Sequence, residues 1–178
     1  RFARPHDLDA LVALDEAAWA PPLRYGRDRL ARRLAGLPEG CLVLQAGDRI
    51  RAAVHVRRVR SRATLLETPV LAAAEPDGQD DGPVFQLLGL VTDPAEPPGP
   101  GLVLLNVTLD WASCQPGVAA ILGITRFGVY DRDRDGPIEA YAGMRGRDGL
   151  PIDPVPRFHA ANGAHIEQLV PAARPEDT

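Results

Sequence analysis

The chain has 178 residues, enough for one hydrophobic core of ordinary size and too few for two domains of usual length. Its formal net charge is −4, and because a nucleic-acid-binding protein normally carries a basic excess, we expect no nucleic-acid partner. No apolar run is long enough to cross a membrane, so we expect no membrane association. The two cysteines, Cys41 and Cys114, cannot build a disulfide framework in a chain of this size, which favours a cytoplasmic location.

The N-terminal half predicts two helices followed by a β-hairpin. Arg1–Arg4 has the pattern of a strand end without an initiating Met, which suggests a domain excised from a longer polypeptide, although a processed or trimmed chain would begin in the same way. Apolar residues at helical spacing follow, and a Gly-Asp pair between two apolar runs is typical of a hairpin. The expected elements are a helix that opens at 5–7 and ends before Pro21, a helix at about 27–35, and strands at 41–46 and 49–60.

The C-terminal half predicts two buried strands, two helices and a closing strand. Asp153 suits the N-cap of the last helix, Pro154 its first position and Gly163 its C-terminal cap. Strands and helices mix without an internal repeat or an interdomain linker, which indicates a single α/β domain over residues 1–178. The expected elements are a loop at 75–83, strands at 84–91 and 118–125, a helix at 102–113, a polar connection at 126–152 and a last strand at 164–170.

Four arginines lie on the faces of the second predicted helix that its leucines leave open. A solvated helix face carries such a cluster without any specific role. The same cluster also suits an acidic protein partner. The sequence leaves both interpretations open for Arg27, Arg29, Arg32 and Arg33.

The first segment with chemical character is Glu96-Pro97-Pro98-Gly99-Pro100-Gly101, between a buried strand and the start of a helix. Backbone N–H groups at a helix start are unpaired and lie at the positive end of the helix dipole, where they bind phosphate or pyrophosphate. Glycine lets the backbone approach such a ligand closely. A plain connecting loop can have the same composition, and the position between strand and helix is what favours a phosphate site.

The spacing of this loop resembles the pyrophosphate loop of the GNAT superfamily, Gln/Arg-x-x-Gly-x-Gly/Ala, with Glu96 in place of the usual Gln or Arg. A carboxylate beside a pyrophosphate is unfavourable, so we expect Glu96 to point away and backbone amides to bind the ligand. The preceding Leu90–Pro94 and the order of elements resemble the same superfamily. The resemblance implies a GNAT fold, in which helices flank a mixed, mostly antiparallel central sheet. It also implies contacts with coenzyme A at Leu90, Val91, Thr92, Gly99, Pro100, Gly101 and Leu102.

The C-terminal segment resembles one branch of this superfamily. GNAT acetyltransferases often carry Phe-Tyr-x-x-x-Gly on the last helix, and this chain has His159 in the Tyr position of Phe158–Gly163. A partly exposed helical histidine without a task is the plainer interpretation. Together with Gly149–Pro154, Leu169–Pro171 and Arg174–Asp177, however, the helix resembles the GNAT-like domains in loading modules of modular polyketide synthases, of the curacin type. This resemblance covers nearly the whole chain.

The resemblance implies decarboxylation of a malonyl-type thioester of coenzyme A, with roles for four residues. Thr125, at the end of a predicted strand, and His159 would hold the substrate carboxylate. Trp19 and Arg174 would line or support the acyl pocket, and Ala173 stands where an aromatic residue often precedes the arginine. Taken singly, Thr125 is an ordinary strand residue, Trp19 suits a core position and Arg174 a surface charge, so the roles depend on all four occurring in the family's order.

Decarboxylation is consistent with the chemistry of these residue types. Loss of CO2 leaves an enolate, so the site must hold the carboxylate out of the thioester plane and stabilise charge on the thioester oxygen. Thr125 and His159 can each donate a hydrogen bond to the carboxylate, and His159 can then return a proton to the enolate. A backbone N–H near Leu90 or Val91 can serve the thioester oxygen. No metal is required.

One segment imitates a metal site. Asp131–Gly136 has the spacing of the start of an EF-hand calcium loop, but the twelfth position, which must supply a Glu, is Ala142. We therefore interpret the segment as an exposed loop and expect no bound metal.

Two other functions stay open beside decarboxylation of malonyl-, methylmalonyl- or dimethylmalonyl-CoA. One is the GNAT reaction that moves an acyl group from coenzyme A to an acyl carrier protein or an amine. The other is a non-catalytic GNAT module that supports neighbouring domains. The resemblance implies an acyl carrier protein and other synthase domains as partners, and the sequence does not fix the number of methyl groups on the substrate.

Overall fold

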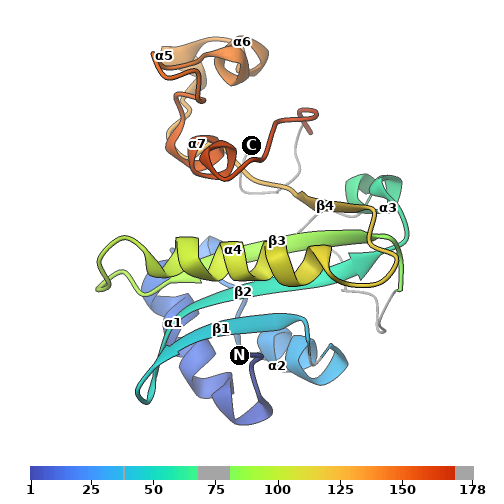
Figure 1. Ribbon diagram of the computed structural model, residues 1–178. Helices are drawn as coiled ribbons and strands as arrows, with labels where there is room; N and C mark the ends of the chain where they lie inside the picture. Colours follow the sequence, from blue (N-terminus) through green and yellow to red (C-terminus); the bar gives the residue numbers. More distant parts are fainter. Residues whose placement is uncertain (38, 68–80, 171–178) are drawn as a thin grey trace. The chain divides into compact units, whose positions relative to one another are not determined.

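The computed structural model places the chain in two compact units (Figure 1). The first unit comprises Arg1–Gly123, and the second starts at Ile124. No helix of the described residues is both long and apolar enough to cross a membrane. The residues that the structure describes are 1–37, 39–67 and 81–170.

A four-stranded sheet forms the centre of the first unit. Its strands are β1 (Cys41–Ala46), β2 (Arg49–Val59), β3 (Val84–Thr92) and β4 (Ala120–Gly123). They lie in chain order, with β1 and β2 antiparallel, β2 and β3 antiparallel, and β3 and β4 parallel. The predicted α/β class with a mixed, mostly antiparallel sheet is confirmed, as is the hairpin at Gly47-Asp48.

Helices cover both faces of this sheet (Figure 1). The main ones are α1 (Leu8–Ala18) and α2 (Arg27–Gly36) on one face and α4 (Pro100–Ser113) on the other. The short ones are η1 (Pro5–Asp7), η2 (Pro21–Leu23) and α3 (Arg62–Glu67). The predicted helices at 5–20, 27–35 and 102–113 are therefore confirmed, whereas α3 was not predicted.

Alternation of side chains along the strands explains why both faces are buried. Val43 and Ala53 belong to a core cluster with α1 and α2, while their neighbours Leu42 and Val54 belong to a second cluster with Leu104 of α4. Removing a large aliphatic side chain from water is worth about 1.5–3 kcal/mol, so the two clusters stabilise the sheet from both sides. As predicted, no residue of β3 is exposed.

The second unit contains only short helices among its described residues, α5 (Arg132–Asp135), α6 (Ile138–Gly143) and α7 (Pro154–Ala161). α7 begins as predicted, because the Asp153 carboxylate accepts the N–H of Val155 at 3.0 Å and Pro154 is the first helical residue. Gly163 follows the helix with φ 87°, a conformation that favours glycine.

Three predictions for the second half of the chain are wrong in whole or part. The segment at 164–170 forms no strand and pairs with no strand of the described residues, so its backbone lacks a ladder partner. The strand at 118–125 is shorter and half-buried, because β4 is the edge strand of the described sheet. The connection at 126–152 contains α5 and α6, and Asp131 begins α5 by accepting the N–H groups of Asp133 and Arg134.

Candidate functional site

β3 loses its neighbour on one side halfway along its length. It pairs with β4 from Val84 to Leu87 and no further, so Leu88–Thr92 faces no strand of the described residues on that edge. The β2–β3 register shifts at the same place, where the extra residue Leu88 forms a bulge. Unpaired backbone groups along such an edge can bind an extended ligand. This stretch contains the predicted contacts Leu90, Val91 and Thr92.

Tyr25 fixes the bulge from the α2 side of the sheet. Its hydroxyl donates a hydrogen bond to the carbonyl oxygen of Leu88 at 2.8 Å. A Cβ on Gly89 would lie 2.2 Å from this hydroxyl, so the contact requires glycine there. The guanidinium of Arg33 lies 4.2 Å above the Tyr25 ring, and the His55 ring is in edge contact with it. The sequence did not reveal Tyr25, because its partner lies 63 positions away.

The N-terminus of α4 begins directly after this open edge. Gly99 is the N-cap with φ 141°, and Pro100, the first helical residue, has no N–H to donate. The N–H of Val103 bonds to the carbonyl of Gly99 at 3.0 Å. The N–H groups of Gly101 and Leu102 therefore have no carbonyl partner within the helix and can bind an anion.

Gly101 also contacts the end of β3. A Cβ there would lie 2.7 Å from the Thr92 hydroxyl oxygen. Glycine is thus needed for the helix start and the strand end to lie this close. The predicted contacts Gly99, Pro100, Gly101 and Leu102 therefore follow one another at the start of α4, with Gly101 directly against Thr92.

Two acidic residues of the loop before α4 are paired with arginines of β2. The Glu96 carboxylate forms an ion pair with Arg51, and both side chains are largely buried. Asp93 pairs with Arg49 at 2.7 Å. The negative charge of Glu96, unusual for a pyrophosphate loop, is therefore balanced by Arg51, a partner that the sequence did not indicate.

Trp19 lies at the end of α1 in the first unit. It is half-buried and packs against the core cluster formed with α1 and α2, and its carbonyl accepts a hydrogen bond from Arg24 at 2.9 Å. The position agrees with the plainer interpretation of Trp19 as a core residue and leaves its substrate role a prediction. Arg174 and Ala173 lie outside the described residues, as does most of the predicted loop at 75–83.

Thr125 and His159 both belong to the second unit. Thr125 is exposed and follows β4 by two residues, so it does not end the strand as predicted. His159 lies on α7, is half-buried, and has its ring in edge contact with Phe158. Burial lowers the pKa of His159 below its usual value. At neutral pH its imidazole is therefore neutral and has one N–H to donate.

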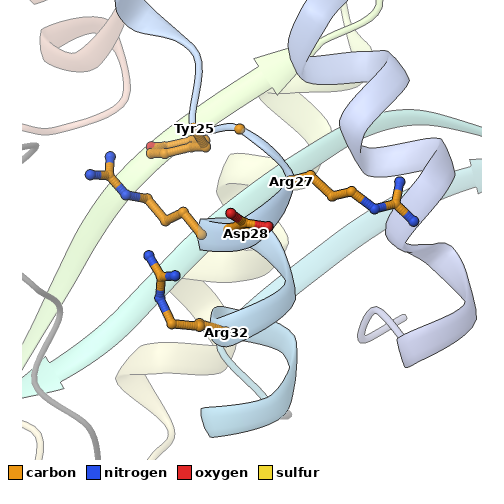
Figure 2. A pocket seen from close by; sticks show the side chains of 6 residues that line it. Tyr25, Arg27, Asp28 and Arg32 are labelled. Atoms are coloured by element: carbon orange, nitrogen blue, oxygen red, sulfur yellow. The ribbon is translucent and has the colours of Figure 1, made fainter.

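The arginine cluster of α2 lines a shallow hollow with Tyr25, Gly26 and Asp28 (Figure 2). Arg27 points toward α1 and pairs with Asp9 at 2.7 Å. Arg33 is buried, with its guanidinium stacked on the Tyr25 ring, so it does not belong to a solvated face. The surface cluster consists of Arg27, Arg29 and Arg32. The described residues contain no group of three His, Cys, Asp or Glu side chains that could hold a metal ion.

Comparison with solved structures identifies the family. The GphF GNAT-like decarboxylase, solved in complex with isobutyryl-CoA, is 38% identical over 99% of this chain and 91% of its own, with a TM-score of 0.88. The chain belongs to the GNAT-like decarboxylase family. The loading GNATL domain of CurA from Lyngbya majuscula is 29% identical over 99% of this chain and 89% of its own, with a TM-score of 0.89. The predicted GNAT fold and the resemblance to loading-module domains are both confirmed. No family model and no curated protein matches the sequence.

Proposed function

We propose that this domain removes CO2 from a malonyl-type thioester of coenzyme A and thereby supplies the starter acyl group of a polyketide. The observation that supports it most is the 38% identity, over almost the entire chain, to a GNAT-like decarboxylase solved with an acyl-CoA. Isobutyryl-CoA is what remains when dimethylmalonyl-CoA loses CO2, so that ligand has the chemistry of a decarboxylation product.

The first unit supplies the coenzyme A site in this proposal. The free N–H groups of Gly101 and Leu102 bind the pyrophosphate at the start of α4. The open edge at Leu90, Val91 and Thr92 offers backbone groups to the pantetheine arm, which carries amides of its own. One backbone N–H near Leu90 or Val91 donates to the thioester oxygen, where negative charge develops as CO2 leaves.

The second unit supplies the groups that act on the carboxylate. The Thr125 hydroxyl and the N–H of His159 hold the carboxylate out of the thioester plane, which lets the electrons of the breaking C–C bond enter the enolate. His159 then passes the proton of its N–H, directly or through water, to the enolate carbon, and its other ring nitrogen takes up a proton from solvent, so that the ring stays neutral. The products are CO2 and the acyl-CoA, and no metal takes part. Trp19 and Arg174 line or support the acyl pocket.

The biological setting belongs to the same proposal. Both units form one GNAT-like domain of a larger cytoplasmic synthase, with an acyl carrier protein and other synthase domains as partners. The surface arginines Arg27, Arg29 and Arg32 of α2 suit an acidic carrier protein, which gives the acyl-transfer alternative a specific surface to test.

Product analysis without an acceptor tests the proposal. Purified domain is incubated with malonyl-, methylmalonyl- and dimethylmalonyl-CoA in turn, and the thioesters are followed by mass. We expect at least one of them to lose the mass of CO2 while remaining attached to coenzyme A. Loss of acyl-CoA only after addition of a carrier protein, with no CO2 released, would support the transferase alternative instead. A non-catalytic module would change none of the thioesters.

A further inference from the structure

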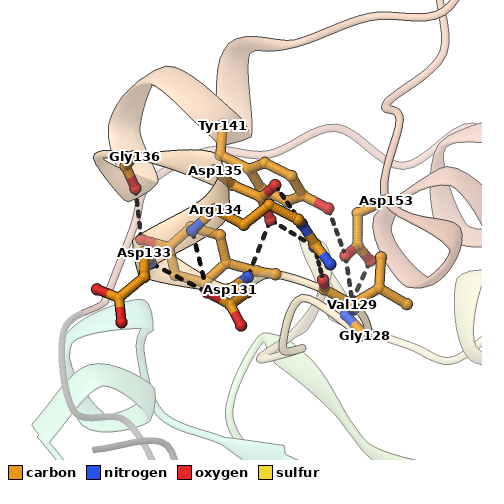
Figure 3. Close-up of polar contacts among 10 residues, drawn as sticks. Gly128, Val129, Asp131, Asp133, Arg134, Asp135, Gly136, Tyr141 and Asp153 are labelled. Atoms are coloured by element: carbon orange, nitrogen blue, oxygen red, sulfur yellow. Dashed lines mark hydrogen bonds and ion pairs between the residues drawn. The ribbon is translucent and has the colours of Figure 1, made fainter.

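Asp153 does more than begin α7 (Figure 3). The residue is buried, and each of its two carboxylate oxygens accepts two hydrogen bonds. Oδ1 accepts the N–H groups of Gly128 at 2.9 Å and Val155 at 3.0 Å. Oδ2 accepts the N–H of Val129 at 3.0 Å and the hydroxyl of Tyr141 at 3.1 Å. Capping the helix uses one of these four bonds, and the other three join separate segments of the second unit.

The carboxylate is stable in this buried position because its partners stabilise the charge. Burial alone raises the pKa of Asp153, but the N–H groups of Gly128, Val129 and Val155, with the Tyr141 hydroxyl, together lower that pKa below its usual value. Asp153 is therefore ionised at neutral pH and all its acceptor capacity is used. Hydrogen bonds to a charged acceptor are the stronger kind and fix geometry well.

Close packing joins the same two segments independently. A Cβ on Gly128 would lie 2.8 Å from a methyl carbon of Val155, so the backbone at Gly128 lies directly against the first turn of α7. The segment from 127 to 129 is thus held to α7 by two hydrogen bonds and by contact. Thr125 lies three residues before Gly128, and His159 lies six residues after Asp153 on the same helix.

We propose that Asp153 is the positioning residue of the decarboxylase site, fixing the segment that carries Thr125 to the helix that carries His159. The inference rests on the proposed function of those two residues. It also concerns a physical coupling inside the second unit that can be measured without any substrate.

The variant Asp153→Asn separates this role from simple capping. Asparagine caps helices about as well as aspartate, and one oxygen can still accept from Val155. Its amide group, however, presents N–H donors to the N–H of Val129, so that link is lost. We expect kcat for CO2 release to fall at least about tenfold, as small displacements of catalytic groups do, with KM for the acyl-CoA within about twofold. A wild-type kcat would overturn the proposal, because capping alone would then explain Asp153.

Asp148→Asn is the matched control. Asp148 precedes α7 and forms an exposed ion pair with Arg157 of that helix, so its loss removes a contact of α7 without touching the segment at 127–129. We expect its kcat to stay within about twofold of wild type. A loss as large as that of Asp153→Asn would mean that any weakening of α7 lowers activity, which would contradict a specific role for Asp153.

A spectroscopic measurement distinguishes failure of this inference from failure of the proposed function. In the 15N-labelled protein we expect Asp153→Asn to shift the amide signal of Thr125 and the imidazole signals of His159, and Asp148→Asn to leave both unchanged. If the wild type releases no CO2, the proposed function fails, while these signals still decide the coupling. If Asp153→Asn does not fold, Gly128→Ala, which crowds Val155, replaces it with the same expectation. Unchanged signals in the folded variant would refute the coupling.

Discussion

The two units differ in what holds them together. In the first, apolar side chains from three helices bury both faces of a sheet. In the second, the buried apolar side chains among the described residues are only Tyr141, Pro151 and Pro156, and a network around Asp153 and Arg134 connects the segments instead (Figure 3). The backbone of the first unit is therefore held in place by many apolar contacts, each of small free energy. The geometry of the second unit depends on a few hydrogen bonds.

The largest expected effect tests the catalytic role proposed for His159. His159→Ala removes the proposed proton donor, so we expect kcat for CO2 release to fall by a factor of about 100 or more, with KM for the acyl-CoA little changed. Product mass at saturating substrate gives the measurement. His165→Ala is the control, because His165 is an exposed histidine of the same unit and should not matter. If both variants keep full activity, the catalytic assignment of the second unit is wrong.

Crowding the N-terminus of α4 should raise KM and leave kcat unchanged, the opposite of the effect expected for His159→Ala. In Gly101→Ala the new methyl group meets the Thr92 hydroxyl and displaces the N–H groups at the helix start. We expect KM for the acyl-CoA to rise about tenfold, equivalent to about 1.4 kcal/mol of binding, while kcat at saturation is retained. Gly36→Ala is the control, because space around that helical glycine is open. Adding Thr92→Ala to Gly101→Ala should restore part of the lost affinity, and no restoration would argue against this contact as the cause.

Acid should destabilise the first unit through a single buried histidine. Burial, and to a smaller extent the charge of Arg33, lowers the pKa of His55 to about 3. The unfolded chain binds a proton near pH 6.5 and the folded one does not, so stability is complete above about pH 6.5 and is lost toward pH 3. The limiting slope is about 1.4 kcal/mol per pH unit. Urea unfolding at pH 7, 6 and 5 measures this slope, with the fluorescence of Trp19 and Trp111, both in the first unit, as the signal.

A variant at position 55 tests whether His55 causes this pH dependence of the unfolding free energy. We expect His55→Gln to lower the slope of the unfolding free energy against pH between pH 6 and 5. The decrease should approach about 1.4 kcal/mol per pH unit, the contribution of one proton. His6→Gln, a change at an exposed histidine of the same unit, should leave the slope unchanged. Equal slopes for wild type and His55→Gln would show that another group causes the acid sensitivity.

The smallest effect concerns the loop charge. Glu96→Gln removes a carboxylate beside the proposed pyrophosphate site and leaves Arg51 without its ion-pair partner. We expect KM for the acyl-CoA to fall about two- to threefold without a change in kcat, because a negative charge near the ligand's phosphates is removed. Asp9→Asn, which breaks the ion pair with Arg27 on α2, is the control. A rise in KM would mean that the Arg51–Glu96 pair holds the loop in its binding form.

The sequence predicted best the features that depend on neighbouring residues. Helix caps such as Asp153 and Gly163, the hairpin turn and the apolar runs of β2 and β3 are local patterns, and all are observed. The resemblance to a loading-module decarboxylase correctly indicated the family. The roles of Thr125, His159, Trp19 and Arg174 stay predictions.

Features that depend on distant partners were missed. A strand at 164–170 needs a neighbour to complete its hydrogen bonds, and its composition says nothing about whether one is present. Tyr25 meets Leu88 across 63 positions, and Arg51 meets Glu96 across 45. Even Asp153, correctly predicted as a cap, gave no sign of its bonds to Gly128 and Val129, because capping requires a single oxygen and the rest of the carboxylate is free to serve other segments.

The contact between Tyr25 and Gly89 has a practical consequence for altering this enzyme. A methyl group at position 89 cannot coexist with the tyrosine hydroxyl, and losing the hydroxyl leaves the Leu88 carbonyl without its donor. Positions 25 and 89 therefore have to be varied together. A library built to reshape the strand edge should change them as a pair, for example Gly89→Ala with Tyr25→Leu, since single substitutions at position 89 would be eliminated for reasons unrelated to substrate choice.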